Sequence, residues 1–253
     1  MAALGDFGHA ILDVLFPPRC VSCRASGAVL CADCLSTMRP PASPLCAHCG
    51  RSLAVMAAVV SGQPPRCPTC AAGRGPHALT SLRIATIYAG PARKAIHALK
   101  YEGQRRVAVS LGDLLAETLR ATDERADLIL PVPLHPTRQR ARGFNQSALL
   151  ARRCAGRLNI PCRTDILTRS RETRSQVGLS LPDRQTNVQG AFALARPGIG
   201  ALLAGKYIVL IDDVTTTGST LDAAAAALRP AMPAAILGLA VARPDLTDDG
   251  PGM

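Results

Sequence analysis

The last two-thirds of the chain alternates short apolar runs with segments of helical periodicity. The predicted strands are the apolar runs at 81–89, 128–132, 160–167, 207–211 and 236–241. Apolar residues at helical spacing predict helices at 92–100, 105–121, 145–158 and 219–229. Short apolar strands separated by helices are typical of a parallel sheet covered on both faces. The pattern therefore predicts an α/β fold that binds its ligand in the loops at the carboxyl ends of the strands.

The first 78 residues follow a different pattern, which cysteines dominate. Four C-x-x-C pairs stand at Cys20/Cys23, Cys31/Cys34, Cys46/Cys49 and Cys67/Cys70. Two such pairs complete a tetrahedral Cys₄ zinc site, and four thiolates leave no position open for water, so two structural zinc sites are predicted. Disulfides are disfavoured in a chain without an export signal, and a redox motif needs only one pair. Spacing leaves open whether the pairs combine sequentially or crosswise.

Three regions follow from these patterns. Residues 1–78 are predicted to form an N-terminal double zinc ribbon, 79–244 the α/β domain and 245–253 a flexible tail. Seven prolines between Pro17 and Pro65 make the ribbon region too irregular to fold on apolar burial alone, so zinc would supply its folding energy. A ribbon of this kind is either a brace that docks protein or a contact for nucleic acid, and both readings stay open.

Composition narrows the choice of partners. The chain is 48% hydrophobic, but aromatic residues are only 3% and Trp is absent, which argues against a stacking platform for single-stranded nucleic acid. The formal net charge is +11, and it stays positive after eight cysteines become zinc-bound thiolates, which favours anionic partners. No apolar run approaches the ~18 residues of a membrane helix, and the N-terminus does not resemble a secretory signal. We therefore expect a cytoplasmic protein with no membrane insertion.

The loop after the run at 207–211 carries the sharpest chemical signal. Two adjacent carboxylates, Asp212 and Asp213, precede a hydroxyl-rich turn and a helix. The turn contains Thr215, Thr216, Thr217, Gly218, Ser219 and Thr220. Backbone N–H groups at a helix start and nearby hydroxyls favour a phosphate, whereas carboxylates suit sugar hydroxyls with Mg²⁺ nearby. The string predicts a site for a ribose 5-phosphate; the alternative, helix capping, explains only one or two of these residues.

Two further loops are rich in arginine. The loop after 128–132 contains Arg138, Arg140 and Arg142, and a second loop, which runs from 169 to 187, contains Arg169 and Arg174. Between positions 138 and 184 the chain has eleven Arg against three acidic residues. Guanidinium groups suit bidentate recognition of phosphate. The alternative interpretation is a solubilising surface in an arginine-biased chain.

The string at 212–220 resembles the phosphoribosyl-diphosphate (PRPP) signature of type I phosphoribosyltransferases. Two further motifs are Leu99-Lys100-Tyr101-Glu102-Gly103 and the P-V-P…R-x-R-x-R-G-F-N-Q run at 131–146. Together with the cysteine pairs, they make almost the whole chain similar to the ComF family of ComFC- and GntX-like proteins. The resemblance implies a double zinc ribbon followed by a type I phosphoribosyltransferase-like parallel sheet flanked by helices.

The resemblance also implies roles for the candidate residues. Asp212 and Asp213 would contact the ribose hydroxyls of Mg²⁺-bound PRPP, and the turn at 215–220 would hold its 5′-phosphate. Arg138, Arg140 and Arg142 would bind pyrophosphate, and Arg169 and Arg174 would close over it from a mobile loop. The family is linked to natural competence and to the use of external DNA.

Two functions stay open at this stage. The first is a phosphoribosyltransferase whose acceptor the sequence does not identify. The second is a non-catalytic adaptor that keeps the fold while it binds single-stranded DNA and a DNA translocase. A transcriptional regulator is a third option, but the sequence offers no clear DNA-reading helix. The acidic pair discriminates the first two, because a pure backbone binder gains nothing from two negative charges.

Overall fold

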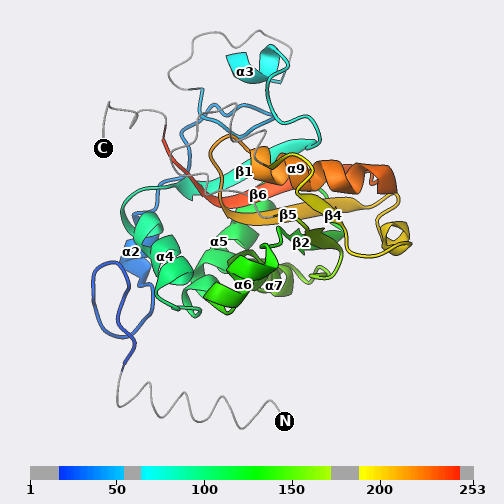
Figure 1. The fold of residues 1–253 in the computed structure, drawn as a ribbon. Coiled ribbons are helices and arrows are strands. Elements are labelled where there is room, and N and C mark those ends of the chain that lie inside the picture. The colour runs from blue at the N-terminus through cyan, green and yellow to red at the C-terminus, as the bar shows by residue number, and fades with distance from the viewer. Residues whose placement is uncertain (1–16, 54–63, 172–187, 246–253) are drawn as a thin grey trace.

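The computed structural model describes residues 17–53, 64–171 and 188–245. Its centre is a parallel sheet in the order β1-β6-β5-β2 (Figure 1). These strands are β1 (Ser81–Ile87), β2 (Leu128–Pro131), β5 (Tyr207–Val214) and β6 (Ala235–Arg243). The predicted α/β fold with a parallel sheet is confirmed. The predicted tail at 245–253 lies, after Asp245, outside the described residues.

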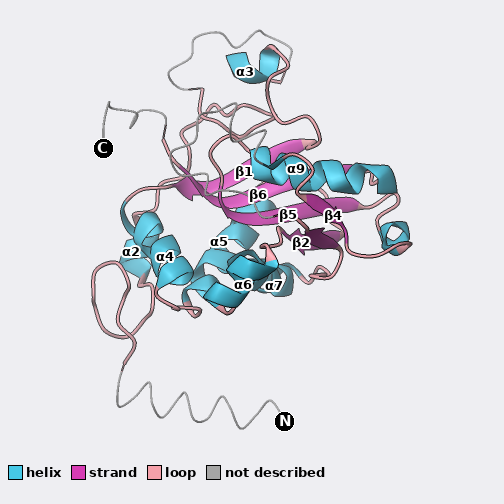
Figure 2. Cartoon of the chain, viewed as in Figure 1, coloured by secondary structure: helices cyan, strands magenta, loops and turns pink. Residues whose placement is uncertain are grey.

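Helices cover both faces of this sheet (Figure 2). The longer helices are α4 (Gly90–Tyr101), α5 (Val107–Arg120), α7 (Gln146–Leu158) and α9 (Ser219–Leu228). The short ones are α2 (Ala32–Ser36), α3 (Pro68–Ala71), α6 (Pro136–Arg142) and the 3₁₀ turns η1 (Ile199–Leu202) and η2 (Arg229–Ala231). Helices α4, α5 and α7 pack on one face, and α9 packs on the other.

Alternation along the strands divides the core into two layers. In β5, Val209 and Ile211 pack with α4, α5 and α7, whereas Ile208 and Leu210 pack with α9. All four side chains are buried. Successive strand residues point to opposite faces, so a strand covered on both sides reads as a continuous apolar run, as the sequence predicted.

The predicted strand at 160–167 is wrong. Residues 161–163 lie beside β2, where the Ile129 N–H donates to the Pro161 carbonyl at 2.9 Å and the Arg163 N–H donates to the Ile129 carbonyl at 3.1 Å, but they form an isolated parallel bridge and no strand. Instead, β3 (Leu167–Arg169) pairs antiparallel with β4 (Phe192–Leu194) in a separate two-stranded sheet. Leu167 and Phe192 pack in the layer that contains α9. The apolar run was misread because burial against a helix layer leaves the same apolar signal as a place in the main sheet.

The outer edge of β1 is covered by the cysteine-rich region. The backbone N–H of Leu82 donates to the carbonyl of His48 at 2.8 Å, and that of Ile87 donates to the carbonyl of Arg39 at 2.8 Å. The Thr86 hydroxyl also donates to the Arg39 carbonyl, at 2.9 Å. An exposed strand edge invites pairing with other chains, and these bonds remove part of that exposure.

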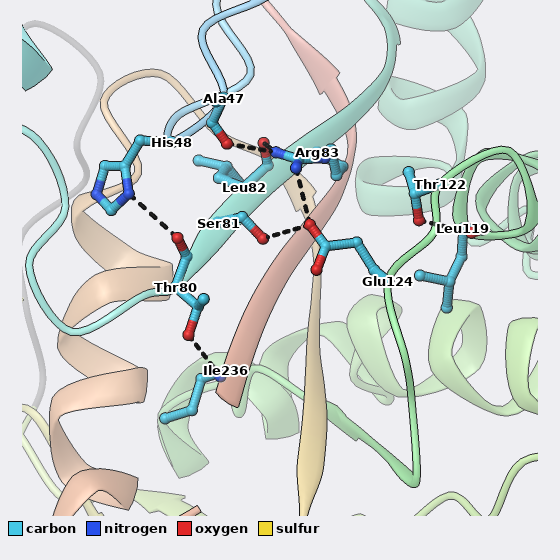
Figure 3. Close-up of polar contacts among 10 residues, drawn as sticks. All are labelled: Ala47, His48, Thr80, Ser81, Leu82, Arg83, Leu119, Thr122, Glu124 and Ile236. Atoms are coloured by element: carbon cyan, nitrogen blue, oxygen red, sulfur yellow. Dashed lines mark hydrogen bonds and ion pairs between the residues drawn. The ribbon is translucent and has the colours of Figure 1, made fainter. Parts of the chain in front are cut away.

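The docking of this region on β1 continues through side chains (Figure 3). The Arg83 guanidinium donates to the Ala47 carbonyl at 2.9 Å and to Glu124 at 2.7 Å. The His48 ring contacts the carbonyl oxygens of Thr80, at 3.1 Å, and of Pro76. The loop around Cys46 and Cys49 is therefore fixed to the strand by backbone and side-chain bonds together.

Candidate functional site

The eight N-terminal cysteines form two separate clusters. Within each cluster all four sulfur atoms lie within 4.8 Å of one another. The first cluster is Cys20, Cys23, Cys31 and Cys34, and the second is Cys46, Cys49, Cys67 and Cys70. The pairs therefore combine sequentially, and the crossed arrangement that spacing left open does not occur.

Both clusters fit a tetrahedral zinc ion. The sulfur atoms of Cys20 and Cys34 are 3.7 Å apart, and those of Cys49 and Cys67 are also 3.7 Å apart. A ZnS₄ tetrahedron with 2.3 Å bonds has edges of about 3.8 Å. The thiolates offer no open coordination position, so these are structural sites that would supply folding energy rather than chemistry.

The two clusters differ in burial and in electrostatic surroundings. All four cysteines of the second cluster are buried, whereas Cys23 in the first is exposed. Beside the second cluster, Arg243 at the end of β6 is buried and donates to the Cys49 carbonyl at 2.7 Å. Burial lowers the pKa of Arg243, and the nearby Cys49 sulfur opposes that shift. A buried cation is stabilised next to a Zn(Cys)₄ group, whose net charge is negative.

The acidic pair occupies the carboxyl end of β5, where both residues still belong to the strand. Asp213 is buried, and its Oδ1 lies 2.9 Å from the Nζ of Lys100, which reaches it from the last turn of α4. The same oxygen accepts from the Val214 N–H at 2.6 Å. Burial is the largest single influence on the pKa of Lys100 and lowers it, but the charge and hydrogen bond of Asp213, together with the charge of Asp212, outweigh burial and the net shift is upward. Lys100 therefore stays charged and compensates the carboxylate.

Asp212 lies beside this pair and is held from α7. Its Oδ1 accepts from the buried Ser147 hydroxyl at 3.0 Å and from the Asp213 N–H at 2.9 Å. Burial, and then the charge of Asp213, raise the pKa of Asp212 to about 7, while Lys100 opposes the shift. Two adjacent carboxylates with one ammonium form a site that accepts further positive charge or hydrogen-bond donors.

The hydroxyl-rich turn joins β5 to α9. Gly218 has φ +88° and begins the helix from the left-handed region, which glycine adopts without a steric penalty. The Thr217 and Ser219 hydroxyls are 2.6 Å apart, and the Ser219 N–H donates to the Thr217 oxygen at 3.2 Å. Thr215 is buried, and its backbone N–H donates a hydrogen bond to the Ala242 carbonyl at 3.0 Å. The remaining predicted residues, Thr216 and Thr220, are half-buried in the same turn.

This turn is also connected to the second cysteine cluster. Asp222, in the first turn of α9, accepts from the backbone N–H groups of Ala78 and Leu79 at 2.7 and 3.2 Å. A Cβ at Gly218 would lie 3.1 Å from the ring of Pro76, the residue whose carbonyl His48 contacts. The linker between ribbon and sheet therefore packs directly against the turn.

The predicted arginines that the structure describes lie on two separate elements. Arg138, Arg140 and Arg142 lie on α6, which follows β2, the strand next to β5 in the sheet. Arg169, on β3, is buried with its guanidinium over the Phe192 ring. Burial and the charge of Arg138 lower the pKa of Arg169, whereas the charge of Asp212 raises it. The charges of Arg138 on α6 and of Asp212 at the end of β5 thus both act on Arg169. Arg174 lies outside the described residues.

The sequence did not predict the roles of Lys100 and Ser147. Lys100 appeared only as part of a family motif. Ser147 lies two residues after Asn145, the residue that caps α7 by accepting from the Ser147 N–H at 3.0 Å. A signal for Lys100 was present in composition, since only three of the 29 cations are Lys. A compact ammonium pairs with one buried carboxylate oxygen where the wide guanidinium fork does not fit. Ser147 had no comparable signal.

Family models match both parts of the chain. A double zinc ribbon domain matches residues 11–63, and a phosphoribosyl transferase domain matches residues 145–249. The zinc-ribbon match ends before Cys67 and Cys70, which the structure adds to the second cluster. The fold and the two matches define a class of protein: a phosphoribosyltransferase-type α/β domain that carries an N-terminal double zinc ribbon.

Curated relatives identify the family within that class. The chain is 31% identical over 220 residues to Competence protein F of Haemophilus influenzae, an alignment that covers 83% of this chain and 90% of the relative. It is 32% identical over 214 residues to the DNA utilization protein YhgH of Salmonella typhi, covering 81% and 87%. The chain belongs to the ComF family.

Solved structures give a weaker likeness. The glutamine PRPP amidotransferase from B. subtilis complexed with ADP and GMP is 19% identical, and the match covers 57% of this chain and 30% of that one with a TM-score of 0.37.

Within the described residues, no helix is both long and apolar enough to span a bilayer.

Proposed function

We propose that the carboxyl end of β5 binds Mg²⁺-PRPP or a closely related phosphoribosyl ligand. One observation carries this proposal: Asp212 and Asp213 are buried side by side at a strand end, directly before a hydroxyl-rich turn that begins α9. The burial of two adjacent carboxylates is costly, and a purely structural turn has no need of it. Ribose hydroxyls and a divalent cation would use both groups.

Each part of the ligand has matching residues on this chain. Asp212 and Asp213 accept hydrogen bonds from the ribose hydroxyls, and the turn at 215–220 binds the 5′-phosphate through its hydroxyls and the start of α9. Arg138, Arg140 and Arg142 on α6, with Arg169 on β3, offer guanidinium donors to the pyrophosphate. Arg174 belongs to the same proposed set. Bound Mg²⁺ supplies charge neutralisation for the pyrophosphate.

In the transfer reaction the bond between C1 of the ribose and the pyrophosphate oxygen breaks, and its electron pair leaves with pyrophosphate. The acceptor's nucleophilic atom forms the new bond to C1 and releases a proton. The chain contributes by positioning the ribose and by stabilising the leaving group, a role that we assign to the arginines of α6 and β3.

The names of the relatives suggest the process in which this site works. Competence protein F is named for competence, and YhgH is named for DNA utilization. We propose that this chain serves a related process in the cytoplasm, where thiols stay reduced and available to zinc. A non-catalytic adaptor that binds single-stranded DNA and a DNA translocase is the second candidate, which the basic charge of the chain favours.

A ligand panel separates the two candidates. Thermal unfolding of the zinc-loaded protein is followed with PRPP and Mg²⁺, ribose 5-phosphate, pyrophosphate and a short oligothymidylate, and pyrophosphate release is assayed beside it. The proposal expects the largest stabilisation with Mg²⁺ and PRPP together, because a ligand stabilises only the state that binds it. Stabilisation by the oligonucleotide alone, unchanged in Asp213→Asn, would support the adaptor and overturn the PRPP site.

A further inference from the structure

A pocket lies between the first zinc knuckle, the turn between Cys20 and Cys23, and helix α4. Its volume is about 500 Å³. It is lined by Val21, Ser22, Arg24, Tyr88, Arg93, Lys94, His97 and Glu102. None of these residues belongs to the proposed PRPP site. The knuckle and α4 lie side by side at one end of the molecule (Figure 1), and the Lys94 ammonium joins them by donating to the Ser22 carbonyl at 3.0 Å.

The charge of this pocket is positive. Arg24, Arg93 and Lys94 line it, and the one lining carboxylate, Glu102, accepts from the His97 ring at 3.0 Å. Among residues 17–53, 64–171 and 188–245, no carboxylate forms an ion pair with Arg24 or Arg93. Lys94 retains two N–H donors beyond its bond to Ser22. Two guanidinium groups and an ammonium are thus available to one ligand.

The chain places these cations where the backbone does not favour them. Arg24 has φ +69°, a left-handed conformation that costs an L-residue energy. The equivalent position of the second knuckle is Gly50, with φ +66° and the same bond from its N–H to the first cysteine of the knuckle, 2.9 Å in both. Gly50 is required there because a Cβ would meet the Leu82 carbonyl oxygen at 2.4 Å. Packing thus explains why position 50 is a glycine, but it does not explain why position 24 is an arginine.

Arg93 and Lys94 also lie where the backbone does not favour a positive charge. They are the fourth and fifth residues of α4, whose first turn has no acidic residue, near the end where the helix dipole is already positive. Cations in this position repel the helix terminus, and a bound anion would remove that repulsion. Three exposed cations from two elements therefore line one pocket.

We propose that this pocket is a second anion site, which binds a phosphoryl group through Arg24, Arg93 and Lys94. Guanidinium forks match the oxygen pairs of phosphate, and a volume of about 500 Å³ lies within the range of small-ligand pockets. The Tyr88 and His97 side chains line the same pocket. The phosphoryl group belongs either to a free phosphorylated molecule or to the phosphodiester of a nucleic acid.

The test distinguishes anion binding in this pocket from anion binding at the proposed PRPP site. The arginine Nε–Hε signals of the zinc-loaded, full-length protein are recorded by NMR during a titration with inorganic pyrophosphate, and Arg24→Gly and Arg93→Gln assign the two pocket signals. Anisotropy of a fluorescein-labelled oligothymidylate is measured in the same variants. Arg66→Gln is the matched control, because it removes one exposed charge beside the second zinc cluster. Zinc content verifies that each variant retains both sites.

The proposal predicts that the Arg24 and Arg93 signals shift on titration, and that each pocket variant weakens binding about tenfold, as loss of one charge-assisted hydrogen bond implies. Weakening of pyrophosphate binding identifies a free phosphorylated ligand, and weakening of oligonucleotide binding alone identifies a phosphodiester. Arg24→Gly also removes the backbone strain of a left-handed arginine, so this variant is expected to fold. If it loses zinc, the binding data of Arg93→Gln alone decide whether the pocket binds the anion. Unshifted signals, or equal weakening by Arg66→Gln, overturn the proposal.

Discussion

The ammonium of Lys100 lies 2.9 Å from Oδ1 of Asp213 and joins the last turn of α4 to the end of β5. Only 4% of the Asp213 side chain and 20% of the Lys100 side chain are exposed. The second oxygen of Asp213, Oδ2, is buried and has no hydrogen-bond partner in the described structure. The pair is therefore compensated in charge but incomplete in hydrogen bonding, and a ligand donor would complete it.

The pair predicts a strong coupling in stability. Lys100→Met leaves a buried carboxylate without its counter-charge, and such a loss costs about 3–5 kcal/mol. Lys100→Met/Asp213→Asn is expected to recover most of that cost, since Asn still accepts from the Val214 N–H. Urea unfolding of the wild type, both single variants and the double variant measures the coupling. Additive effects of the two substitutions would contradict the compensating role of Lys100.

The raised pKa of Asp212 predicts opposite effects on stability and binding. Its pKa is about 7 in the fold, above the value of about 3.9 expected for an unfolded chain, so the folded state binds more protons between these values. The contribution of Asp212 to stability is therefore present at low pH and lost as pH rises through about 7. Asp212→Asn should raise the melting temperature by a few degrees at pH 8, and by much less at pH 4.

The same titration governs the ligand. Only ionised Asp212 accepts from two ribose hydroxyls or faces a divalent cation, so the affinity for Mg²⁺-PRPP is expected to fall as the pH drops below about 7. Asp212→Asn should weaken binding and flatten this pH profile. Wild-type affinity that is constant from pH 8 to pH 5.5, at fixed free Mg²⁺, would show that Asp212 does not meet the ligand.

Gly218 predicts a steric test of the turn. Its φ of +88° and a Cβ position 3.1 Å from Pro76 and 3.2 Å from Leu82 make Gly218→Ala both strained and crowded. Gly205→Ala is the matched control, because Gly205 has φ +66° with open space around it. Both variants should lose about 1–2 kcal/mol from backbone strain, and Gly218→Ala should lose more and also bind PRPP less tightly. Equal losses in stability and affinity would remove the role assigned to the turn.

The second zinc site predicts a link between metal and ligand. His48 stands between two of its cysteines and contacts Pro76, which packs against Gly218. A chelator should remove zinc first from the cluster with exposed Cys23 and later from the buried second cluster. PRPP affinity is expected to persist through the first release and to fall with the second. A colour assay of released zinc, run beside a binding measurement, follows both phases, and a fall in affinity during the first phase would contradict the link.

Much of the fold was readable from the sequence because each β strand of the main sheet is buried on both faces. The apolar runs at 207–211 and 236–241 therefore coincide with β5 and β6, although the strands extend further. The run at 160–167 failed because helix-layer packing leaves the same apolar signature. The sequence left the grouping of the cysteine pairs open, because spacing alone does not show that Cys46 and Cys67 come together. The folded structure brings them into one cluster.

The candidate site divided in the same way. Asp212, Asp213 and the turn stood out because their chemistry is contiguous in sequence. Ser147 is 65 residues from Asp212 along the chain, and Lys100 is further still from Asp213, so only the packing of α4 and α7 on β5 brings these pairs together. Non-local partners of this kind leave no periodic signal, and a compositional one only where a rare residue type is used.

The most direct test of the phosphoribosyl site is a calorimetric titration of PRPP with Mg²⁺ into the zinc-loaded protein and into Asp212→Asn/Asp213→Asn. Asp165→Asn is the control, because it removes one exposed carboxylate that pairs with Arg163. The account predicts binding in the wild type and in the control, and its loss in the double variant while the fold persists. Equal binding by all three proteins, or none by a folded wild type, would contradict it.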